Sequence, residues 1–239
     1  MLIYGHRGAP ATFPENTLPS FEAAIHAGVD GLEFDVRASA DGVPVVLHDQ
    51  DLARTTSGAG NVDELSLATI RQLDAGNGET VPKLEEVLDL VADLVHLDIE
   101  VKQSGIESIV LATLARFPRA RWTLSSFDPE ILIAFRAISQ TVHLIPIAAL
   151  ANPPLVEFAR SINAPAVALL STAYDESSSR IFAGGSLPVI VWTVNDIFEA
   201  ERVQQLGAHG LCTDCPADII AGLASRPDAL NTLPGASRI

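Results

Sequence analysis

Two short stretches of the chain, 32–37 and 97–102, alternate apolar and charged residues. Successive side chains of a β-strand point to opposite faces, so the charged residues of each stretch share one face. These charged residues are Glu33, Asp35 and Arg37 in the first stretch, and Asp98, Glu100 and Lys102 in the second. Residues two positions apart lie roughly 6.5 Å apart along a strand. On neighbouring strands Glu33, Asp35 and Glu100 can therefore converge on one point.

Glu33, Asp35 and Glu100 form a candidate cation site. Three carboxylates held close together repel one another unless a cation lies between them. Carboxylate oxygens suit Mg²⁺ or Ca²⁺ better than zinc. The alternative is a structural ion-pair network with Arg37 and Lys102, but buried ion pairs rarely stabilise a fold better than apolar side chains do. We therefore expect the three acids to bind a divalent cation, Mg²⁺ or Ca²⁺.

Two histidines stand where predicted strands give way to loops. His6 and Arg7 lie between two glycines, and His48 follows a short apolar run. An adjacent histidine and arginine can bring a titrating group and a fixed cation close to an anion. Two imidazoles can serve as general base and general acid on opposite sides of a phosphorus centre. The sequence leaves open which histidine does which, and Glu15 and Asn16 lie near enough to His6 to orient it.

The residues above need a scaffold that brings several strand ends together. The 239-residue chain alternates short β-rich runs with amphipathic segments. Strands are expected over Leu2–Gly5, Gly31–Val36, Val95–Val101, Trp122–Ser126, His143–Ile147, Ala166–Leu170, Val189–Val194 and Gly210–Thr213. Helices are expected over Thr17–Ala27, Leu84–Leu94, Ile106–Phe117, Pro129–Ile138 and Asp196–Leu206. Eightfold alternation at this length predicts an α/β fold, a (β/α)8 TIM barrel whose C-terminal strand ends carry the active site.

One further apolar run, Val43–Leu47, does not fit this alternation. Only six residues separate it from the preceding strand, whereas a parallel crossover needs a dozen or more. The run must therefore return antiparallel as a short β-hairpin, with Asp41 and Gly42 in the turn. We expect one barrel domain over residues 1–225, an excursion from it over 37–83, and a flexible tail over 226–239.

The composition bears on partners and location. Thirty acidic and 15 basic residues give a net charge of −15, which repels nucleic acid and anionic lipid. The two cysteines, Cys212 and Cys215, are too few for a disulfide framework. No signal peptide or membrane-spanning run is recognised. We expect a cytoplasmic protein with a small-molecule substrate, without nucleic-acid partners and without stable membrane association.

An ordered set of short motifs extends over nearly the whole chain. The motifs are His6-Arg7-Gly8, PENT at 14–17, Glu33-Phe34-Asp35, Asp41-Gly42, His48-Asp49, RTT at 54–56, LDAG at 73–76, LEEVL at 84–88, Glu100-Val101-Lys102, Ser126-Phe127, WTVN at 192–195 and Thr213-Asp214. Each motif alone is weak, but the ordered set resembles the glycerophosphodiester phosphodiesterase family.

The resemblance implies a metal-dependent enzyme that hydrolyses glycerophosphodiesters to sn-glycerol 3-phosphate and an alcohol. It implies a divalent cation on Glu33, Asp35 and Glu100, and acid-base catalysis by His6 and His48. The glycerol's own hydroxyl would attack phosphorus in a two-step route, giving a cyclic phosphate that water then opens.

The resemblance also implies how the substrate is held. Arg7 would steady the phosphate, Lys102 would add positive charge near it, and Phe127 and Trp192 would form apolar walls. The segment Asn77–Lys83 is shorter than is usual in the family, which puts the substrate-facing lip in doubt. Two alternatives stay open: a non-catalytic phosphodiester-binding barrel, and a related phospholipase or sphingomyelinase D-like enzyme that releases a cyclic phosphate.

Overall fold

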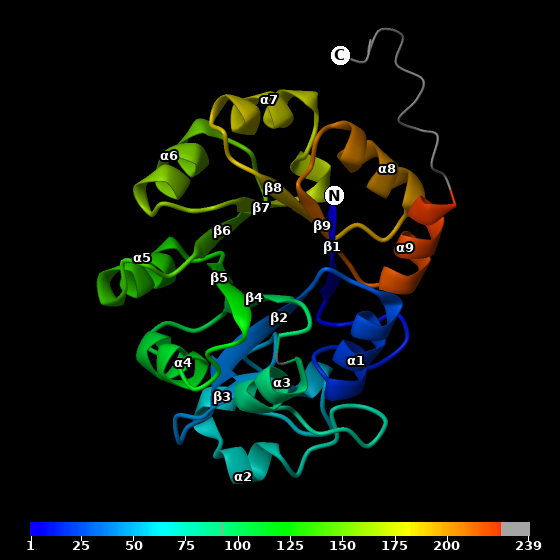
Figure 1. The fold of residues 1–239 in the computed structure, drawn as a ribbon. Helices are drawn as coiled ribbons and strands as arrows, with labels where there is room; N and C mark the ends of the chain where they lie inside the picture. Colours follow the sequence, from blue (N-terminus) through cyan, green and yellow to red (C-terminus); the bar gives the residue numbers. More distant parts are fainter. Residues whose placement is uncertain (92, 226–239) are drawn as a thin grey trace, which may run out of the picture.

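The core of the protein is a closed ring of parallel strands (Figure 1). A computed structural model describes residues 1–91 and 93–225. The parallel strands are β1 (Leu2–His6), β2 (Gly31–Ala38), β4 (His96–Val101), β5 (Arg121–Ser126), β6 (Leu144–Ala148), β7 (Val167–Leu170), β8 (Val189–Trp192) and β9 (Gly210–Thr213). Because β1 pairs with both β2 and β9, the eight strands close. The predicted (β/α)8 TIM barrel is confirmed.

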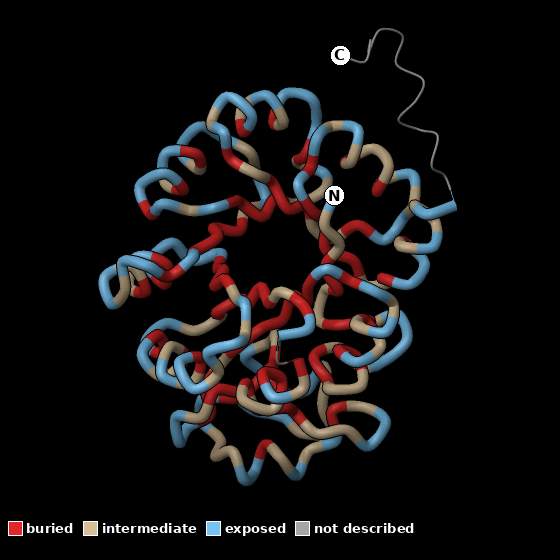
Figure 2. Tube along the Cα trace, in the orientation of Figure 1, coloured by how far each residue is buried: buried red, intermediate tan, exposed pale blue. Residues whose placement is uncertain are grey.

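Helices in the described part of the chain pack around the outside of this ring (Figure 1). They are α1 (Leu18–Ala27), α3 (Leu84–Val91), α4 (Glu107–Leu114), α5 (Pro129–Ile138), α6 (Pro153–Ser161), α7 (Glu176–Gly184), α8 (Ile197–Gln205) and α9 (Pro216–Ala224). The apolar side of each strand faces them, and Figure 2 shows buried positions along the strands and the inner sides of the helices. Phe34 of β2 and Phe21 of α1, both fully buried, pack with ring centroids 5.4 Å apart.

The run that follows β2 returns as a hairpin. β3 (Pro44–Val46) pairs antiparallel with β2, after a turn in which Gly42 has a φ of 76°, a conformation that favours glycine. The chain then passes through two 3₁₀ helices, η1 (Leu52–Arg54) and η2 (Val62–Glu64), and through α2 (Leu67–Ile70). This excursion has a small apolar core of its own, made by Val45, Leu47, Leu52, Val62, Ile70, Ala75 and Val81.

Element bounds differ from the prediction at strand and helix ends, for example at α4, which ends at Leu114 and not at Phe117. β2 runs to Ala38 because its last residues keep pairing with β3. β8 ends at Trp192, two residues before the predicted end. The predicted tail, 226–239, lies outside the described residues. Among the residues that are described, no helix combines the length and the apolar character that crossing a membrane requires.

The N-terminal end of the barrel interior is filled by Tyr4 and His96. The Tyr4 hydroxyl lies 3.3 Å from Nδ1 of His96. Gly31 leaves room for the Tyr4 ring, because a Cβ atom there would lie 2.3 Å from Cε1 of Tyr4. Burial, followed by the charges of Arg121 and His143, lowers the pKa of His96 to about 4.

Candidate active site

The carboxylates predicted to bind a cation lie at the C-terminal mouth of the barrel. In the register of β2 and β4, Asp35 lies opposite Glu100, and Glu33 lies opposite Asp98. One oxygen from each of Glu33, Asp35 and Glu100 lies within 4.8 Å of the others. All three residues are buried, with exposures of 6%, 0% and 6%. The structure thus brings together the three acids that the alternation predicts.

Burial and mutual repulsion perturb these carboxyl groups. Burial, followed by the charges of Asp35 and Glu100, raises the pKa of Glu33 well above its ordinary value. Burial, followed by the charge of Asp35, raises the pKa of Glu100 to about 7. Burial opposes ionisation of Asp35 as well, but Arg7 and Lys102 hold its pKa below the usual value. The three acids therefore carry more potential negative charge than the two cations neutralise.

His6 ends β1, with carboxylates on both sides of its ring. Its Nδ1 lies 2.7 Å from Oδ1 of Asp214, and its Nε2 lies 3.8 Å from Oε2 of Glu33. Asp214 directly follows β9, which pairs with β1. Nδ2 of Asn195 donates to Oδ2 of Asp214 at 2.6 Å, and the Asp214 backbone N–H donates to Oδ1 of Asn195 at 2.8 Å. These contacts fix the plane of the His6 ring.

His48 lies two residues beyond β3, and both of its ring nitrogens have partners. Nδ1 lies 2.5 Å from Oδ1 of Asp49, and Nε2 lies 3.1 Å from Nζ of Lys102. An ammonium group can only donate, so Nε2 accepts and Nδ1 carries the ring proton. Burial is the main cause that lowers the pKa of His48. A hydrogen bond from Arg54 lowers the pKa of Asp49 strongly, so Asp49 faces the ring as a carboxylate.

Arg7 and Lys102 are the cations in contact with the acidic triad. Nε of Arg7 lies 3.1 Å from Oδ2 of Asp35, and one terminal nitrogen donates to Glu15 at 2.9 Å. Nζ of Lys102 donates to Oε1 of Glu100 at 2.8 Å and lies 3.7 Å from Oδ1 of Asp35. Arg7 adopts a φ of 54°, so the chain turns sharply where β1 ends. Both cations thus border the acidic triad at the barrel mouth.

Phe127 and Trp192 form one side of the mouth. Their rings meet edge to face with centroids 5.3 Å apart, and Nζ of Lys102 lies 5.5 Å from the centroid of Phe127. The cavity that they border has a volume of about 140 Å³. Its lining consists of His6, Arg7, Glu33, His48, Asp98, Glu100, Phe127, Ile147, Ala168, Trp192 and Cys212. The lining therefore combines charged side chains with apolar ones.

The sequence alone does not reveal several of these contacts. Glu15 and Asn16 were candidates to orient His6, but Asp214 holds its Nδ1, while Nδ2 of Asn16 donates to Oδ2 of Asp35 at 2.9 Å. Arg37, the other cation of the ion-pair alternative, donates to the carbonyl of His48 at 2.8 Å. The position of Asp214 directly after the last strand was the available signal, since closure of a barrel places that strand beside the first.

Comparison with known proteins connects this site to one family. Residues 6–218, a span that holds both histidines and the acidic triad, match the Glycerophosphoryl diester phosphodiesterase family. The chain belongs to this family. Membership of the glycerophosphoryl diester phosphodiesterase family makes the chain a phosphodiesterase. The glycerophosphodiester phosphodiesterase of Caldanaerobacter subterraneus is 31% identical to it over 236 residues, which cover 92% of this chain and 96% of that relative.

The barrel is similar to solved structures of phosphodiesterases. A phosphodiesterase from Oleispira antarctica, in complex with the product sn-glycerol-3-phosphate, has a TM-score of 0.88 at 27% identity, covering 94% of this chain and 97% of that one. Glycerophosphodiester phosphodiesterase from Agrobacterium tumefaciens has a TM-score of 0.82 at 26% identity, covering 92% and 99%. The fold and the family thus agree.

Proposed function

We propose that this phosphodiesterase hydrolyses glycerophosphodiesters to sn-glycerol 3-phosphate and an alcohol. The observation that carries the proposal is the meeting of the three acids with His6 and His48 at the barrel mouth. The substrate class is supported by the similarity to the Caldanaerobacter enzyme and by the product bound to the Oleispira enzyme. Sequence and geometry thus support the same reaction class.

A divalent cation, Mg²⁺ or Ca²⁺, fits the triad of Glu33, Asp35 and Glu100. Oδ1 of Asp35 is buried and has no hydrogen-bond partner among the described residues. Both cations take carboxylate oxygens as ligands. Burial and repulsion raise the pKa of Glu33 and of Glu100, and a nearby cation would return both to the ionised form. When bound, the cation would supply positive charge beside the phosphate.

Arg7 and Lys102 would hold the phosphate against this site. Arg7 offers a fixed planar cation, and Lys102 a mobile one. In the structure Lys102 also donates to Nε2 of His48 at 3.1 Å. A phosphate oxygen that draws Lys102 toward it would free this nitrogen for proton transfer. Phosphate binding would in this way prepare His48 for chemistry.

His6 and His48 would move the protons that the reaction requires. We infer that the glycerol hydroxyl attacks phosphorus while one histidine takes its proton and the other protonates the departing alcohol. Water would then open the cyclic phosphate, with the two histidines exchanging roles. Asp214 and Asp49 would hold Nδ1 of each ring, leaving Nε2 for the substrate. Phe127 and Trp192 would keep the apolar side of the substrate out of water.

Product analysis tests this proposal directly. Phosphorus NMR of glycerophosphocholine with the enzyme and Mg²⁺ or Ca²⁺ should show sn-glycerol 3-phosphate as the final product. A cyclic phosphate that persists as the end product would favour the phospholipase or sphingomyelinase D-like alternative. Binding of the diester without any turnover would favour the non-catalytic barrel.

Three further statements stay predictions from the sequence. They are the cytoplasmic location, the absence of nucleic-acid partners and of stable membrane association, and the assignment of residues 1–225 to one domain.

A further inference from the structure

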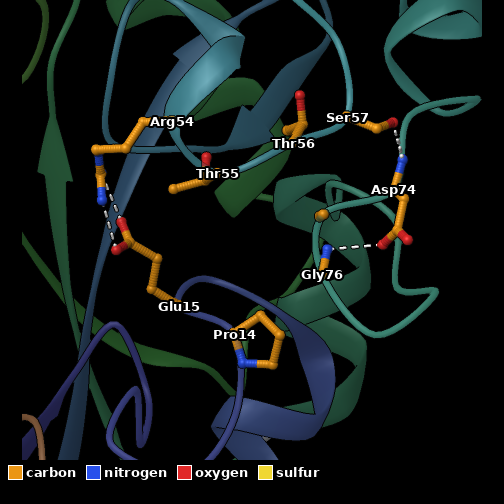
Figure 3. Close-up of a pocket in the computed structure, with 9 residues that line it drawn as sticks. Pro14, Glu15, Arg54, Thr55, Thr56, Ser57, Asp74 and Gly76 are labelled. Atoms are coloured by element: carbon orange, nitrogen blue, oxygen red, sulfur yellow. Dashed lines mark hydrogen bonds and ion pairs between the residues drawn. The ribbon is translucent and has the colours of Figure 1, made fainter.

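An open groove lies beside the active site, between the loop after β1 and the excursion (Figure 3). It encloses about 490 Å³ and is lined by residues 14–15, 54–57 and 74–76. Two guanidinium nitrogens of Arg54 donate to the two carboxylate oxygens of Glu15, each at 2.8 Å. Figure 3 shows this double contact on one side of the groove, across from Asp74 and Gly76. The side chain of Arg54 is 47% exposed, so small solutes can reach it.

Arg54 also contacts the residue that holds His48. Its Nε donates to Oδ2 of Asp49, and Oδ1 of the same carboxylate faces Nδ1 of His48 at 2.5 Å. One guanidinium therefore serves two carboxylates, on Asp49 and on Glu15. The first of these lies in the loop after β3 and the second in the loop after β1.

Glu15 extends the chain of charges to the acidic triad. Its Oε1 accepts from Arg7 at 2.9 Å, and Arg7 in turn lies 3.1 Å from Asp35. Lys102 closes the circuit, since it lies 3.7 Å from Asp35 and 3.1 Å from Nε2 of His48. The result is a closed ring of alternating charges through His48. Arg54 and Glu15 form its outer arc, away from the carboxylates that would bind the cation.

We propose that Arg54 and Glu15 are positioning residues, which tie the loop that carries His48 to the loop that carries Arg7. The proposal rests on the proposed function, because it takes His48 and Arg7, one from each loop, to act on the same bound phosphate. Through Asp49, Arg54 fixes the His48 ring, and through Glu15 it fixes the Arg7 guanidinium. Neither Arg54 nor Glu15 lines the 140 Å³ cavity, so both act through the residues that they hold.

An ordinary surface ion pair is the competing interpretation. Exposed pairs contribute little to stability and, away from an active site, nothing to rate. The Arg180–Glu176 pair is of this kind, with a separation of 2.7 Å and side chains 76% and 78% exposed. Arg54 differs because its planar fork engages two carboxylates at once, a geometry that lysine cannot reproduce. Its removal should therefore lower the rate far more than the stability.

Arg54→Ala, with Arg180→Ala as the matched control, separates the two interpretations. On glycerophosphocholine, Arg54→Ala should lower kcat by about tenfold or more, because small misplacements of catalytic groups cost rates of this order. KM and the melting temperature should change little, and Arg180→Ala should match the wild type. Added guanidinium, which can enter through the groove, should restore part of the lost kcat, whereas urea, a neutral molecule of similar shape, should not.

Arg54→Lys keeps a cation and covers the case in which the alanine variant fails to fold. It should fold and still lose kcat, since an ammonium lacks the planar fork that donates twice to Glu15 while Nε donates to Asp49. Wild-type kcat in either variant, or a loss in Arg54→Ala that guanidinium leaves unchanged, would overturn the inference while the proposed function stands. A wild-type protein that does not turn over the diester would overturn both.

Discussion

Each histidine at the barrel mouth has a carboxylate on its Nδ1 atom, and this pairing decides what a single substitution should do. Asp214 holds His6 and Asp49 holds His48. A carboxylate at this position fixes the tautomer and the ring orientation, which prepares Nε2 to accept or donate a proton. Neither histidine packs into the apolar core of the barrel, so their removal should affect the rate rather than the fold.

The histidine pair can be tested by single and double substitution. General acid-base catalysis typically contributes ~10²–10⁴-fold. His6→Ala and His48→Ala should therefore each lose kcat on that scale, with an unchanged melting temperature. If the two act as a unit, the double variant should lose far less than the product of the single losses. A single variant that keeps wild-type kcat/KM would show that this histidine has only a structural role.

At the scale of elements, the pairing of β1 and β2 depends on Gly31, which lies opposite Tyr4 near the N-terminal end of the barrel. A Cβ atom at Gly31 would lie 2.3 Å from the Tyr4 ring and 2.9 Å from the His96 carbonyl oxygen. Overpacking of a filled interior typically costs ~1–3 kcal/mol. Gly31→Ala should therefore lower the free energy of unfolding by about that amount.

Gly184→Ala is the matched control for this substitution. Gly184 is the exposed last residue of α7, and a Cβ atom there would meet nothing within 4 Å. Denaturation in urea should show a neutral or slightly stabilising effect, because alanine has a helix propensity roughly 1 kcal/mol better than that of glycine. Equal stabilities of the two variants would contradict the packing that we describe at Gly31.

The elements themselves could be predicted from the sequence to a large degree. The barrel strands are short β-rich runs that alternate with amphipathic segments, and the hairpin followed from the few residues before Val43. α5 begins at Pro129 as expected, and α8 begins at Ile197, one residue later than expected; Asp128 and Asp196 accept backbone hydrogen bonds at their N-termini. The alternation of apolar and charged residues in β2 and β4 predicted which side chains face the barrel interior, and these include Glu33, Asp35 and Glu100.

The contacts around the acids could not be predicted in the same way. His6 and Asp214 are 208 positions apart, and nothing in local periodicity links them. Arg54 and Glu15, 39 positions apart, meet only because the excursion folds back against the loop after β1. Such pairs depend on the path of loops, whereas alternation reports only which face of a strand a residue occupies.

At the scale of the whole molecule, the pH dependence of stability contains a contribution from His96. Its pKa is lowered to about 4 in the folded state, against about 6.5 when unfolded. The folded protein therefore keeps His96 neutral while the unfolded chain takes up a proton between these values. This contribution leaves stability unaffected above pH 6.5 and lowers it as the pH falls toward 4, by up to about 3 kcal/mol.

A comparison of the wild type with His96→Gln isolates this contribution. Other groups titrate in both proteins, so the difference between their unfolding free energies reports His96. Between pH 7 and pH 4, the free energy of unfolding of the wild type should fall relative to that of His96→Gln, by up to about 3 kcal/mol. An offset between the two proteins that stays constant with pH would contradict the assignment of a neutral His96.

The protein has a net charge of −15, whereas the site for the proposed substrate would have to attract an anionic phosphate. Arg7 and Lys102 supply two positive charges, and both are already paired with carboxylates. In the proposed function, the remaining attraction would come from a cation on Glu33, Asp35 and Glu100. Metal dependence is therefore the central claim about how this phosphodiesterase works.

Activity of the metal-free enzyme tests this claim most directly. The protein would be treated with EDTA, its metal content checked by elemental analysis, and its turnover of glycerophosphocholine measured before and after adding Mg²⁺ or Ca²⁺. We predict that chelation abolishes turnover, that one of the two ions restores it, and that Glu33→Gln needs a higher ion concentration for half of its own maximal rate. Full activity of the verified metal-free enzyme would contradict the account.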